Sequence, residues 1–444
     1  MDSKTDRRKF LHHSLLMTAG IGLVPGAFAT TKKVSANDRI NVGLIGCRNM
    51  GFHGLRTALN TGEVNCLGIC DVDQKVLAQR QSEIKEEFGQ NPKTYGDFRK
   101  LLEDKEIDAV FVGTPDHWHC LPTIYACEAG KDVYVEKPLA NTIHECNLMV
   151  AAARKHNRIV QVGQQQRSGK VWKAVMAYIH AGKLGKLRKV NIWANFRYGT
   201  GAEKQPDGPV PDGVDFDMWL GPAPKRSFNP TRFHGNWRHF WDYGGGLMTD
   251  WGVHLIDMGL WAGDVKEGPK EIMAFGDNLS YPDHSRETFD TMSVTYPMGD
   301  FVMNWEHTAG IQVGPYDMPY GVEFVGDNAV IVADRGDWSV KPEKAEDGAQ
   351  VTLEAKQDFM EDGPGDLEAH VRNFIEAVRS RKQPNCPVET GRNVALYAHM
   401  GNIAVRSGAG RLLWDEGNLR FTNHEEANRF ILPEYRDPWR LPVY

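Results

Sequence analysis

The feature that most constrains the fold is a glycine-bounded turn between an apolar segment and a helical one. Residues 39–46 form a short, β-rich apolar segment, and residues 52–59 continue at helical spacing. Gly46-Cys47-Arg48-Asn49-Met50-Gly51 lies between them, the dinucleotide fingerprint G-x-G-x-x-G with arginine at the middle glycine. We assign Gly46, Arg48, Asn49, Met50 and Gly51 to a pyrophosphate-binding turn. Arg48 either holds the turn further from the pyrophosphate or offers it a guanidinium.

An acidic residue follows at the distance that this motif requires. The apolar segment 64–70 ends in Asp71, twenty residues after Gly51. A carboxylate at this place accepts the ribose hydroxyls and disfavours a 2′-phosphate. The sequence therefore predicts NAD as the cofactor, with NADP less favoured.

Apolar and helical segments then alternate as far as residue 163, which predicts a doubly wound parallel sheet. Polar side chains follow the strands 109–112, 132–135 and 158–162, where open parallel sheets bind their ligands. We assign the following of these to the cofactor: Thr114, Pro115, Asp116, His117, His119, Glu136, Lys137 and Gln164. Trp118 and Arg167, from the same segments, are assigned to the substrate.

Two further motifs give the sequence a family resemblance. Glu136-Lys137-Pro138 follows a strand, and Asp250-x-x-x-His254 follows the triple glycine at 244–246. With the fingerprint, Asp71 and the segment 114–119, they resemble the Gfo/Idh/MocA family of NAD(P)-dependent sugar oxidoreductases. The resemblance implies a Rossmann domain, a second domain with an open, largely antiparallel sheet, a nicotinamide cofactor, and a homo-oligomer (dimer or tetramer) assembled through that sheet.

The same residues suit alcohol oxidation by their chemistry. This reaction needs a group that accepts the hydroxyl proton and a cation or donor that stabilises the developing alkoxide. Lys137 and His254 can supply both, and a cis bond before Pro138 would aim Lys137 into the cleft. Asp250 lies four residues before His254 on the helical segment 247–261, so its carboxylate can orient the imidazole. We assign Lys137, His254 and Asp250 as catalytic; the alternative is a structural helix start.

A metal centre is a weaker alternative for these side chains. His117, His119, Asp250 and His254 could assemble one from three segments. Neither His-x-His nor Asp-x-x-x-His has the spacing and general base of a metallohydrolase. We assign no metal.

The second half of the chain alternates at period two in several stretches, which predicts one antiparallel sheet within an α+β domain. An aromatic and basic segment, residues 233–243, precedes the triple glycine. Trp237, Arg238 and Asp242 could bind a sugar ring, or the aromatic rings could pack under the loop. The polar, acidic segment 337–366 predicts a loop.

The predicted organisation has four parts. They are a signal peptide (1–29), an NAD-binding Rossmann domain (39–163), a substrate and oligomerisation domain (164–424) and a C-terminal arm (425–444). In the signal peptide, Arg7-Arg8 precedes the uncharged segment 10–31, and Ala27-Phe28-Ala29 fits a cleavage site. This resembles a twin-arginine signal, which exports folded proteins. We therefore expect the export machinery as a partner and a soluble, periplasmic protein with no membrane anchor.

The composition bears on other partners and on the thiols. The chain has 52 Lys+Arg and 58 Asp+Glu, a net charge of −6, so it lacks the basic footprint of a nucleic-acid binder. Its seven cysteines form no close Cys-x-x-Cys pair, and buried free thiols are expected.

Export also constrains the reaction, because no pool of free cofactor exists outside the cytoplasm. The predicted function is an exported NAD-dependent oxidoreductase that acts on a secondary hydroxyl of a sugar or glycoside and keeps its cofactor bound through turnover. The alternatives are an NAD-dependent glycoside hydrolase working through transient oxidation and a non-catalytic sugar-binding protein. One exported branch of the family hydrolyses N-acetylgalactosaminides and lacks the lysine present here as Lys137, so we favour the oxidoreductase.

Overall fold

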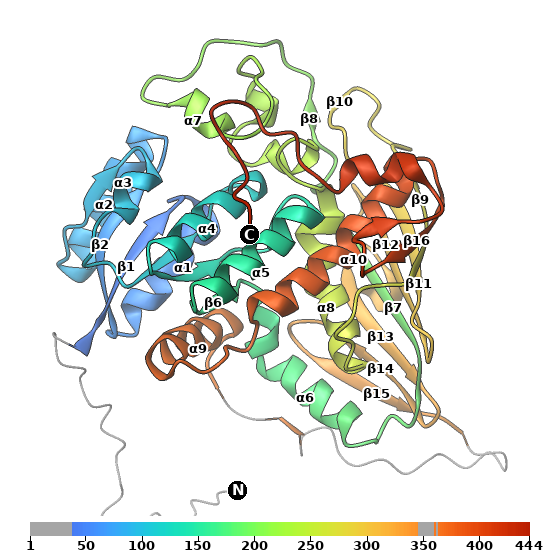
Figure 1. Cartoon of the computed structure of the whole chain (residues 1–444). Helices are drawn as coiled ribbons and strands as arrows, with labels where there is room; N and C mark the ends of the chain where they lie inside the picture. Colours follow the sequence, from blue (N-terminus) through green and yellow to red (C-terminus); the bar gives the residue numbers. More distant parts are fainter. Residues whose placement is uncertain (1–37, 345–358, 361–362) are drawn as a thin grey trace, which may run out of the picture.

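The computed structural model describes residues 38–344, 359–360 and 363–444, and contains two large sheets with helices between them (Figure 1). The expected signal peptide, residues 1–29, lies outside the described residues. Among the helices that are described, none is long and apolar enough to cross a bilayer.

The first sheet has six parallel strands in the order β3-β2-β1-β4-β5-β6. Its strands are β1 (Ile40–Ile45), β2 (Val64–Cys70), β3 (Lys93–Tyr95), β4 (Ala109–Val112), β5 (Asp132–Val135) and β6 (Val160–Val162). Every residue of β4 and β5 is buried, as expected for parallel strands covered on both faces. The predicted doubly wound sheet is confirmed, and the strand order reverses between β1 and β4, where such sheets open a crevice.

Helices cover this sheet on both faces. They are α1 (Asn49–Asn60), α2 (Gln74–Phe88), α3 (Phe98–Leu102), α4 (Cys120–Glu128), α5 (Ile143–Lys155) and, from the end of the chain, α9 (Asp366–Ser380). Helix α2 begins where the Asp73 carboxylate accepts from the N–H groups of Lys75 and Val76. Helix α5 begins similarly at the Thr142 hydroxyl, which accepts from the Glu145 N–H.

The second sheet has nine strands in the order β15-β14-β13-β7-β12-β11-β9-β16-β17. They are β7 (Leu187–Phe196), β9 (Glu271–Asp277), β11 (Thr291–Pro297), β12 (Val302–Ala309), β13 (Tyr320–Gly326), β14 (Ala329–Ala333), β15 (Trp338–Pro342), β16 (Arg411–Asp415) and β17 (Arg420–Phe421). All neighbours are antiparallel except β7 and β12, so the mostly antiparallel sheet is confirmed. A separate pair is formed by β8 (Ala202–Glu203) and β10 (His284–Ser285).

Strand β15 corrects part of the loop expected over residues 337–366. Trp338 is buried and pairs with Ala333 of β14, and the strand continues to Pro342. Its alternation of Trp338 and Val340 with polar residues is only five residues long, and acidic sequence follows it. Strand β15 therefore forms mainly because it can pair with β14, and less because of its own sequence.

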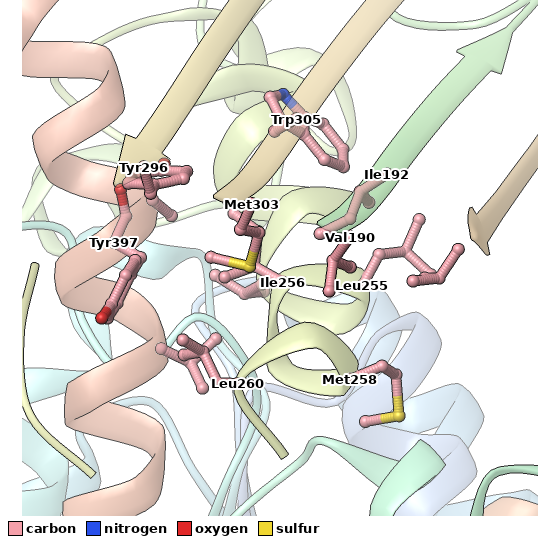
Figure 2. Packing of buried hydrophobic residues seen from close by; sticks show 14 of the residues in the cluster. Val190, Ile192, Leu255, Ile256, Met258, Leu260, Tyr296, Met303, Trp305 and Tyr397 are labelled. Carbon is pink, nitrogen blue, oxygen red and sulfur yellow. The ribbon is translucent and has the colours of Figure 1, made fainter. Parts of the chain in front are cut away.

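One face of the nine-stranded sheet is covered by α6 (Lys170–His180), α8 (Val253–Ala262) and α10 (Val388–Arg406). Figure 2 shows Ile256 of α8 beside Met303 of β12, and Leu255 of α8 near Val190 of β7. Each of these side chains is nearly inaccessible to solvent, and burial of each contributes about 1.5–3 kcal/mol. This core fixes α8, and with it His254, against the sheet.

The segment after β17 returns to the first sheet. It begins with the 3-10 helix Glu425–Phe430 and then crosses toward α4 and α7 (Phe216–Leu220), as the dark red trace in Figure 1 shows. Near its end, Trp439 is buried, with its ring centroid 4.8 Å from that of Trp118 and 6.4 Å from that of Phe98. The C-terminal residues therefore pack on the half of the chain that contains the parallel sheet.

Candidate active site

A cavity of about 320 Å³ runs from the turn after β1 to the start of α8. Most of the residues singled out from the sequence line it: Gly46, Arg48, Asn49, Met50, Asp71, Thr114, Pro115, Asp116, Trp118, His119, Glu136, Lys137, Trp237, Arg238, Asp250 and His254. One end is thus formed by the turns of the parallel sheet and the other by the second half of the chain.

The turn after β1 depends on the close packing of three glycines. Gly46 has φ +88°, in the region that favours glycine, and a Cβ on Gly51 would lie 2.2 Å from the Gly46 carbonyl oxygen. A Cβ on Gly113, at the end of β4, would lie 2.3 Å from the Gly51 Cα. Gly51 thus lies behind the turn rather than in the cavity lining. Without side chains here, the backbone can approach a ligand closely.

Asp71 and Arg48 place opposite charges beside this turn. The Asp71 carboxylate accepts from the backbone N–H of Cys47 (2.7 Å) and of Asp73 (3.0 Å), which ties the end of β2 to the turn. Burial raises the pKa of Asp71, while these N–H groups and Arg48 oppose the rise. The Arg48 Nε is buried without a hydrogen-bond partner in the described part of the chain. Together, these groups offer an acceptor and a cation to a dinucleotide.

His119 connects the two turns that shape the middle of the cavity. Its Nδ1 lies 2.7 Å from the Pro138 carbonyl oxygen, and its Nε2 lies 2.9 Å from that of Thr114. Burial lowers the pKa of His119 to about 4, so the ring is neutral at physiological pH. The Lys137–Pro138 peptide bond is cis, and Lys137 lines the cavity.

Lys137 is bound to the second half of the chain through Asp250. Its Nζ donates to Asp250 Oδ1 (2.5 Å) and to the Asp250 carbonyl oxygen (2.8 Å). The same carboxylate accepts from Arg238 Nε (3.3 Å) and from the Tyr198 hydroxyl (3.2 Å). Burial opposes ionisation of Asp250, but the Lys137 and Arg238 charges outweigh it and hold its pKa well below the usual range. The carboxylate is therefore ionised and fixed.

His254 lacks the partner expected from the sequence, the Asp250 carboxylate. The helical segment begins as a π-helix, Met248–Gly252, and becomes α-helical at Val253. Asp250 bonds to Lys137, Arg238 and Tyr198, and in the described residues the His254 Nδ1 has no hydrogen-bond partner. The carboxylate thus does not orient the imidazole by a direct bond. Burial, with the positive charge of Lys137, lowers the pKa of His254 well below its usual value.

Two buried acids line the middle of the cavity beside Lys137. Burial raises the pKa of Glu136 to about 7, and Gln165 Nε2 lies 3.4 Å from its Oε1. Burial also raises the pKa of Asp116 well above its usual value, against the opposing charges of Arg238 and Lys137. Burial therefore favours the protonated forms of Glu136 and Asp116, whereas the neighbouring cations hold Asp250 ionised.

Besides Gly51, four residues assigned from the sequence do not line this cavity. Arg167 forms two hydrogen bonds to the fully buried Asp257 and is needed there as its counter-charge. Gln164 donates to the Val253 carbonyl oxygen, and Asp242 pairs with Arg226.

His117 faces away as well. Its Nε2 lies 3.0 Å from the Trp219 carbonyl oxygen. Trp118 does line the cavity, but its indole N–H donates to the carbonyl oxygens of Met218 and Trp219, both at 3.1 Å. These contacts are made between segments about a hundred residues apart, which local sequence patterns do not indicate.

Several lining residues were missed from the sequence, among them His234, Gln165 and Arg335. Tyr198, which holds Asp250, was also missed, although it lies two residues beyond the end of a recognised strand, a usual place for site residues. Arg335 follows β14, and its guanidinium lies 4.7 Å from the Trp251 ring centroid. No local motif marks Arg335, because only the tertiary fold brings it to Trp251, which lies far from it in the sequence.

Two family models match the chain. The oxidoreductase family model for the NAD-binding Rossmann fold matches residues 40–164. The model for the C-terminal alpha/beta domain of the same family, GFO_IDH_MocA_C2, matches residues 171–296 and 347–441.

Curated relatives match over a shorter part. A glycosyl hydrolase family 109 protein of Shewanella sp. (strain W3-18-1) is 30% identical over 154 residues, 34% of each chain. Inositol 2-dehydrogenase of Salmonella agona (strain SL483) is 28% identical over 149 residues, 33% of this chain and 43% of the relative. The chain therefore spans about a third to two fifths of the length of these relatives.

Solved structures share the fold over most of the chain. Aldose-aldose oxidoreductase of Caulobacter crescentus, complexed with glycerol, has a TM-score of 0.63 at 17% identity, covering 84% of this chain and 99% of that one. Levoglucosan dehydrogenase, in complex with NADH and levoglucosan, has a TM-score of 0.64 at 20% identity, with the same coverage.

Proposed function

Because the chain belongs to the Gfo/Idh/MocA oxidoreductase family, we propose that it is an NAD-dependent oxidoreductase acting on a secondary hydroxyl of a sugar or glycoside. The observation that carries the proposal is the Lys137–Asp250 ion pair. It lies beside His254 in the same cavity that begins at the glycine turn. Nucleotide-binding and proton-handling groups thus share one space.

The residues of the turn fit a dinucleotide. A Cβ would clash at Gly46, Gly51 and Gly113, and the buried Arg48 Nε has no partner in the described chain. The packing of these glycines shapes the turn at the N-terminus of α1, and a pyrophosphate bound there would give the Arg48 guanidinium a partner. The Asp71 carboxylate would accept from the ribose hydroxyls and repel a 2′-phosphate, which favours NAD over NADP. When bound, the nicotinamide ring supplies the hydride acceptor or donor.

The proton chemistry follows from the charges of the site. The Lys137 ammonium, fixed by Asp250, donates a hydrogen bond to the substrate hydroxyl oxygen and stabilises the alkoxide that develops there. His254 is neutral and accepts the hydroxyl proton as hydride leaves the adjacent carbon. In the reverse direction, the imidazolium returns that proton to the carbonyl oxygen.

A sugar fits the aromatic side chains at the substrate end. Trp237 and Trp251 line the cavity there, and the cations Arg238 and Arg335 lie over their rings at 4.3 and 4.7 Å. Aromatic rings with a few directed donors are typical of sites for polar rings. Inositol and levoglucosan, named in the relatives, are compounds of this kind.

We also retain export and cofactor retention as parts of the proposal. They rest on the signal-like residues 1–29 and on the argument that no free NAD is available after export. A tightly held cofactor requires a cycle that returns it to its starting state, as in a two-sugar oxidoreductase. The fold shared with an aldose-aldose oxidoreductase supports such a cycle.

A second candidate function is glycoside cleavage through transient oxidation. The aligned glycosyl hydrolase family 109 protein favours it, although the match covers only 34% of either chain. The presence of Lys137 favours the oxidoreductase, which would act by net oxidation of one sugar or by paired oxidation and reduction of two.

One assay separates these functions. The purified chain is tested for bound NAD(H) by absorbance and mass, and then incubated with a panel of sugars and aryl glycosides. NADH formation, or reduction of a second sugar, supports the oxidoreductase. Release of aglycone without net NADH supports the hydrolase. Binding without turnover supports a sugar-binding protein.

Assembly through the nine-stranded sheet is the last part of the proposal. The face away from α6, α8 and α10 exposes Phe275, Met273 and Val302 between polar residues. Phe275 is 72% exposed, which is unusual for an aromatic side chain on a strand. A dimer or tetramer would cover it, and light scattering of the wild type and of Phe275→Glu would show whether the oligomer depends on this face.

A further inference from the structure

A second cavity, of about 350 Å³, lies behind one wall of the first. The wall consists of residues 116–118 and 237–245. Asp116 and Arg238 face the active-site cavity, whereas His117, Trp241 and Asp242 face the second one. Its other walls come from α5, α10 and residues 429–435 of the C-terminal segment, so it is distinct from the catalytic residues.

Arg406, in the last turn of α10, is the unusual group in this cavity. Its guanidinium lies between two aromatic rings, 4.2 Å from the Trp241 centroid and 4.4 Å from that of Phe430. In the part of the chain that the structure describes, it makes no hydrogen bond and no ion pair. Burial lowers its pKa to about 10, so it stays charged at neutral pH. Its planar N–H donors are therefore held in place but unused.

The neighbouring charges are already engaged. Asp242 pairs with Arg226, and Arg429, which also lines the cavity, pairs with Glu426. The charge of Glu287 also acts on Arg406, and the Glu287 carboxylate accepts a hydrogen bond from the backbone N–H of Trp241 at 2.9 Å. Arg406 thus lacks a direct counter-charge, and a partly desolvated cation in that state favours an anionic ligand.

The acids on the far wall do not cancel this cation. Glu145 accepts from the hydroxyls of Tyr435 (2.5 Å) and Thr142 (2.9 Å), and burial raises its pKa to about 7. It is therefore partly protonated at neutral pH and occupied by protein donors. Glu434 is exposed to solvent at the rim.

The rest of the lining is suited to hydroxyl groups. His117 Nδ1 is buried and has no hydrogen-bond partner within the described residues, and His117 lines this cavity. The amides of Asn141 and Asn402 line it as well. The volume is that of small-molecule sites and holds a monosaccharide.

We propose that the second cavity binds a monosaccharide-sized organic anion. Arg406 would bind its carboxylate, sulfate or phosphate group through the planar guanidinium, and His117 and the two asparagines would meet its hydroxyls. The proposal is independent of the catalytic residues.

Isothermal titration of the purified chain tests the site with four probes at constant ionic strength. They are D-glucuronate, D-glucose 6-phosphate, D-glucose and inorganic sulfate. We expect saturable 1:1 binding of at least one of the two sugar anions, weak or no binding of glucose, and weaker binding of sulfate. The two sugar anions distinguish a carboxylate from a phosphate ester as the bound group.

Variants locate the binding. Arg406→Gln should weaken the sugar anion about 10- to 100-fold, the usual contribution of a hydrogen bond to a charged group. Arg406→Lys keeps the charge and the stem, so it tests the planar fork in a chain expected to fold. Arg406→Lys should weaken binding of the sugar anion about tenfold, and the midpoint of thermal unfolding should not change. Arg188→Gln, whose side chain is exposed at the start of β7, should bind like the wild type.

Three results would overturn the proposal. One is that neither sugar anion binds at millimolar concentration, and another is that both Arg406 variants bind like the wild type. The third is that Lys137→Met abolishes binding, which would assign the anion to the active-site cavity. Loss of oxidoreductase activity in Lys137→Met with sugar-anion binding intact would instead leave this second site supported.

Discussion

At the scale of single residues, the charge balance of the active site depends on Asp250. One carboxylate accepts from Lys137, Arg238 and Tyr198, and its ionised state is held by two cations. Lys137 is thereby fixed with one face of its ammonium group toward Asp250. The remaining N–H can be directed at a substrate oxygen, which is the geometry that alkoxide stabilisation needs.

Replacing Lys137 by methionine should therefore separate catalysis from cofactor binding. Lys137→Met keeps the length of the side chain but removes the donor, and we expect kcat to fall by about 10²- to 10⁴-fold. The NADH Kd, measured by fluorescence titration, should change little, because the pyrophosphate turn is untouched. The exposed Lys75→Met is the matched control and should keep wild-type kcat. Wild-type kcat in Lys137→Met would remove this residue from the mechanism.

Glu136 should make stability depend on pH. Its pKa is raised by burial from 4.5 to about 7, so the native state binds more protons than the unfolded state between these values. The free energy of unfolding should then fall as pH rises through this range and level off above it. Glu136→Gln should not show this loss of stability with rising pH. The loss amounts to up to roughly 3 kcal/mol at 1.36 kcal/mol per pKa unit.

Urea unfolding of wild type and Glu136→Gln at pH 5 and pH 8 measures this difference. The stability of the wild type relative to the variant should decrease from pH 5 to pH 8. The exposed Glu86→Gln should follow the wild type at both pH values. Parallel pH dependences of wild type and Glu136→Gln would show that burial does not perturb this carboxyl.

Sequence reasoning identified which residues gather at the site better than it identified their bonds. Lys137, Asp250 and His254 do line one cavity. Their pairing was not predicted, because Asp250 bonds across to a residue 113 positions away instead of along its own helix. Arg167 shows the same limit, since its counter-charge Asp257 belongs to another element, and the pairing of buried charges is decided by tertiary packing.

At the scale of elements, the strand–turn–helix unit at the start of the first sheet sets the nucleotide end of the cavity. Gly46 and Gly51 are in contact across the turn, and Gly113 brings β4 against the same place. The turn, the start of α1 and the end of β4 therefore form one close-packed unit. Any side chain at Gly51 must push these three pieces apart.

Gly51→Ala should therefore abolish tight NADH binding and lower stability. Its Cβ would lie 2.2 Å from a backbone carbonyl oxygen that cannot move without distorting the turn. Gly54→Ala, one turn later on the same helix, is a matched control, because its Cβ would lie 3.7 Å from Phe111, an ordinary contact. The control should keep NADH binding and gain up to about 1 kcal/mol of stability from helix propensity. Equal NADH Kd values in the two variants would contradict this account.

Elements with a clear period were predictable, and those that depend on neighbours were not. The alternation from residue 39 to residue 163 predicted five of the six parallel strands, because each of the five carries its own apolar pattern, whereas β3 (Lys93–Tyr95) has no such pattern and was not predicted. The parallel pairing of β7 with β12 has no local signal, since register between distant strands is set by the whole sheet. The π-helical start of α8 was likewise missed, because hydrophobic spacing over five residues does not distinguish helix types.

At the scale of the whole molecule, the end of the chain joins the two halves. After β17 on the second sheet, the chain returns to the first sheet and ends beside α4 (Figure 1). Trp439 packs there on Trp118, which lines the active-site cavity, and on Phe98 of α3. Residues 429–435 close the second cavity on the way. The segment predicted only as an arm therefore lines the second cavity and packs against Trp118 in the wall of the first.

Trp439→Ala tests this role of the C-terminal segment. Removal of a buried indole should lower the free energy of unfolding by about 3 kcal/mol, at the lower end for large-to-small changes because the segment lies near the surface. Because the Trp118 indole loses its neighbour beside the cavity, the Kd for NADH should also rise several-fold. The neighbouring Arg440→Ala, whose side chain is exposed, should change neither quantity. Urea unfolding and NADH titration measure the two effects. Unchanged stability in Trp439→Ala would mean that the segment contributes nothing to the union of the two halves, whereas lost stability with an unchanged Kd would confine its role to folding.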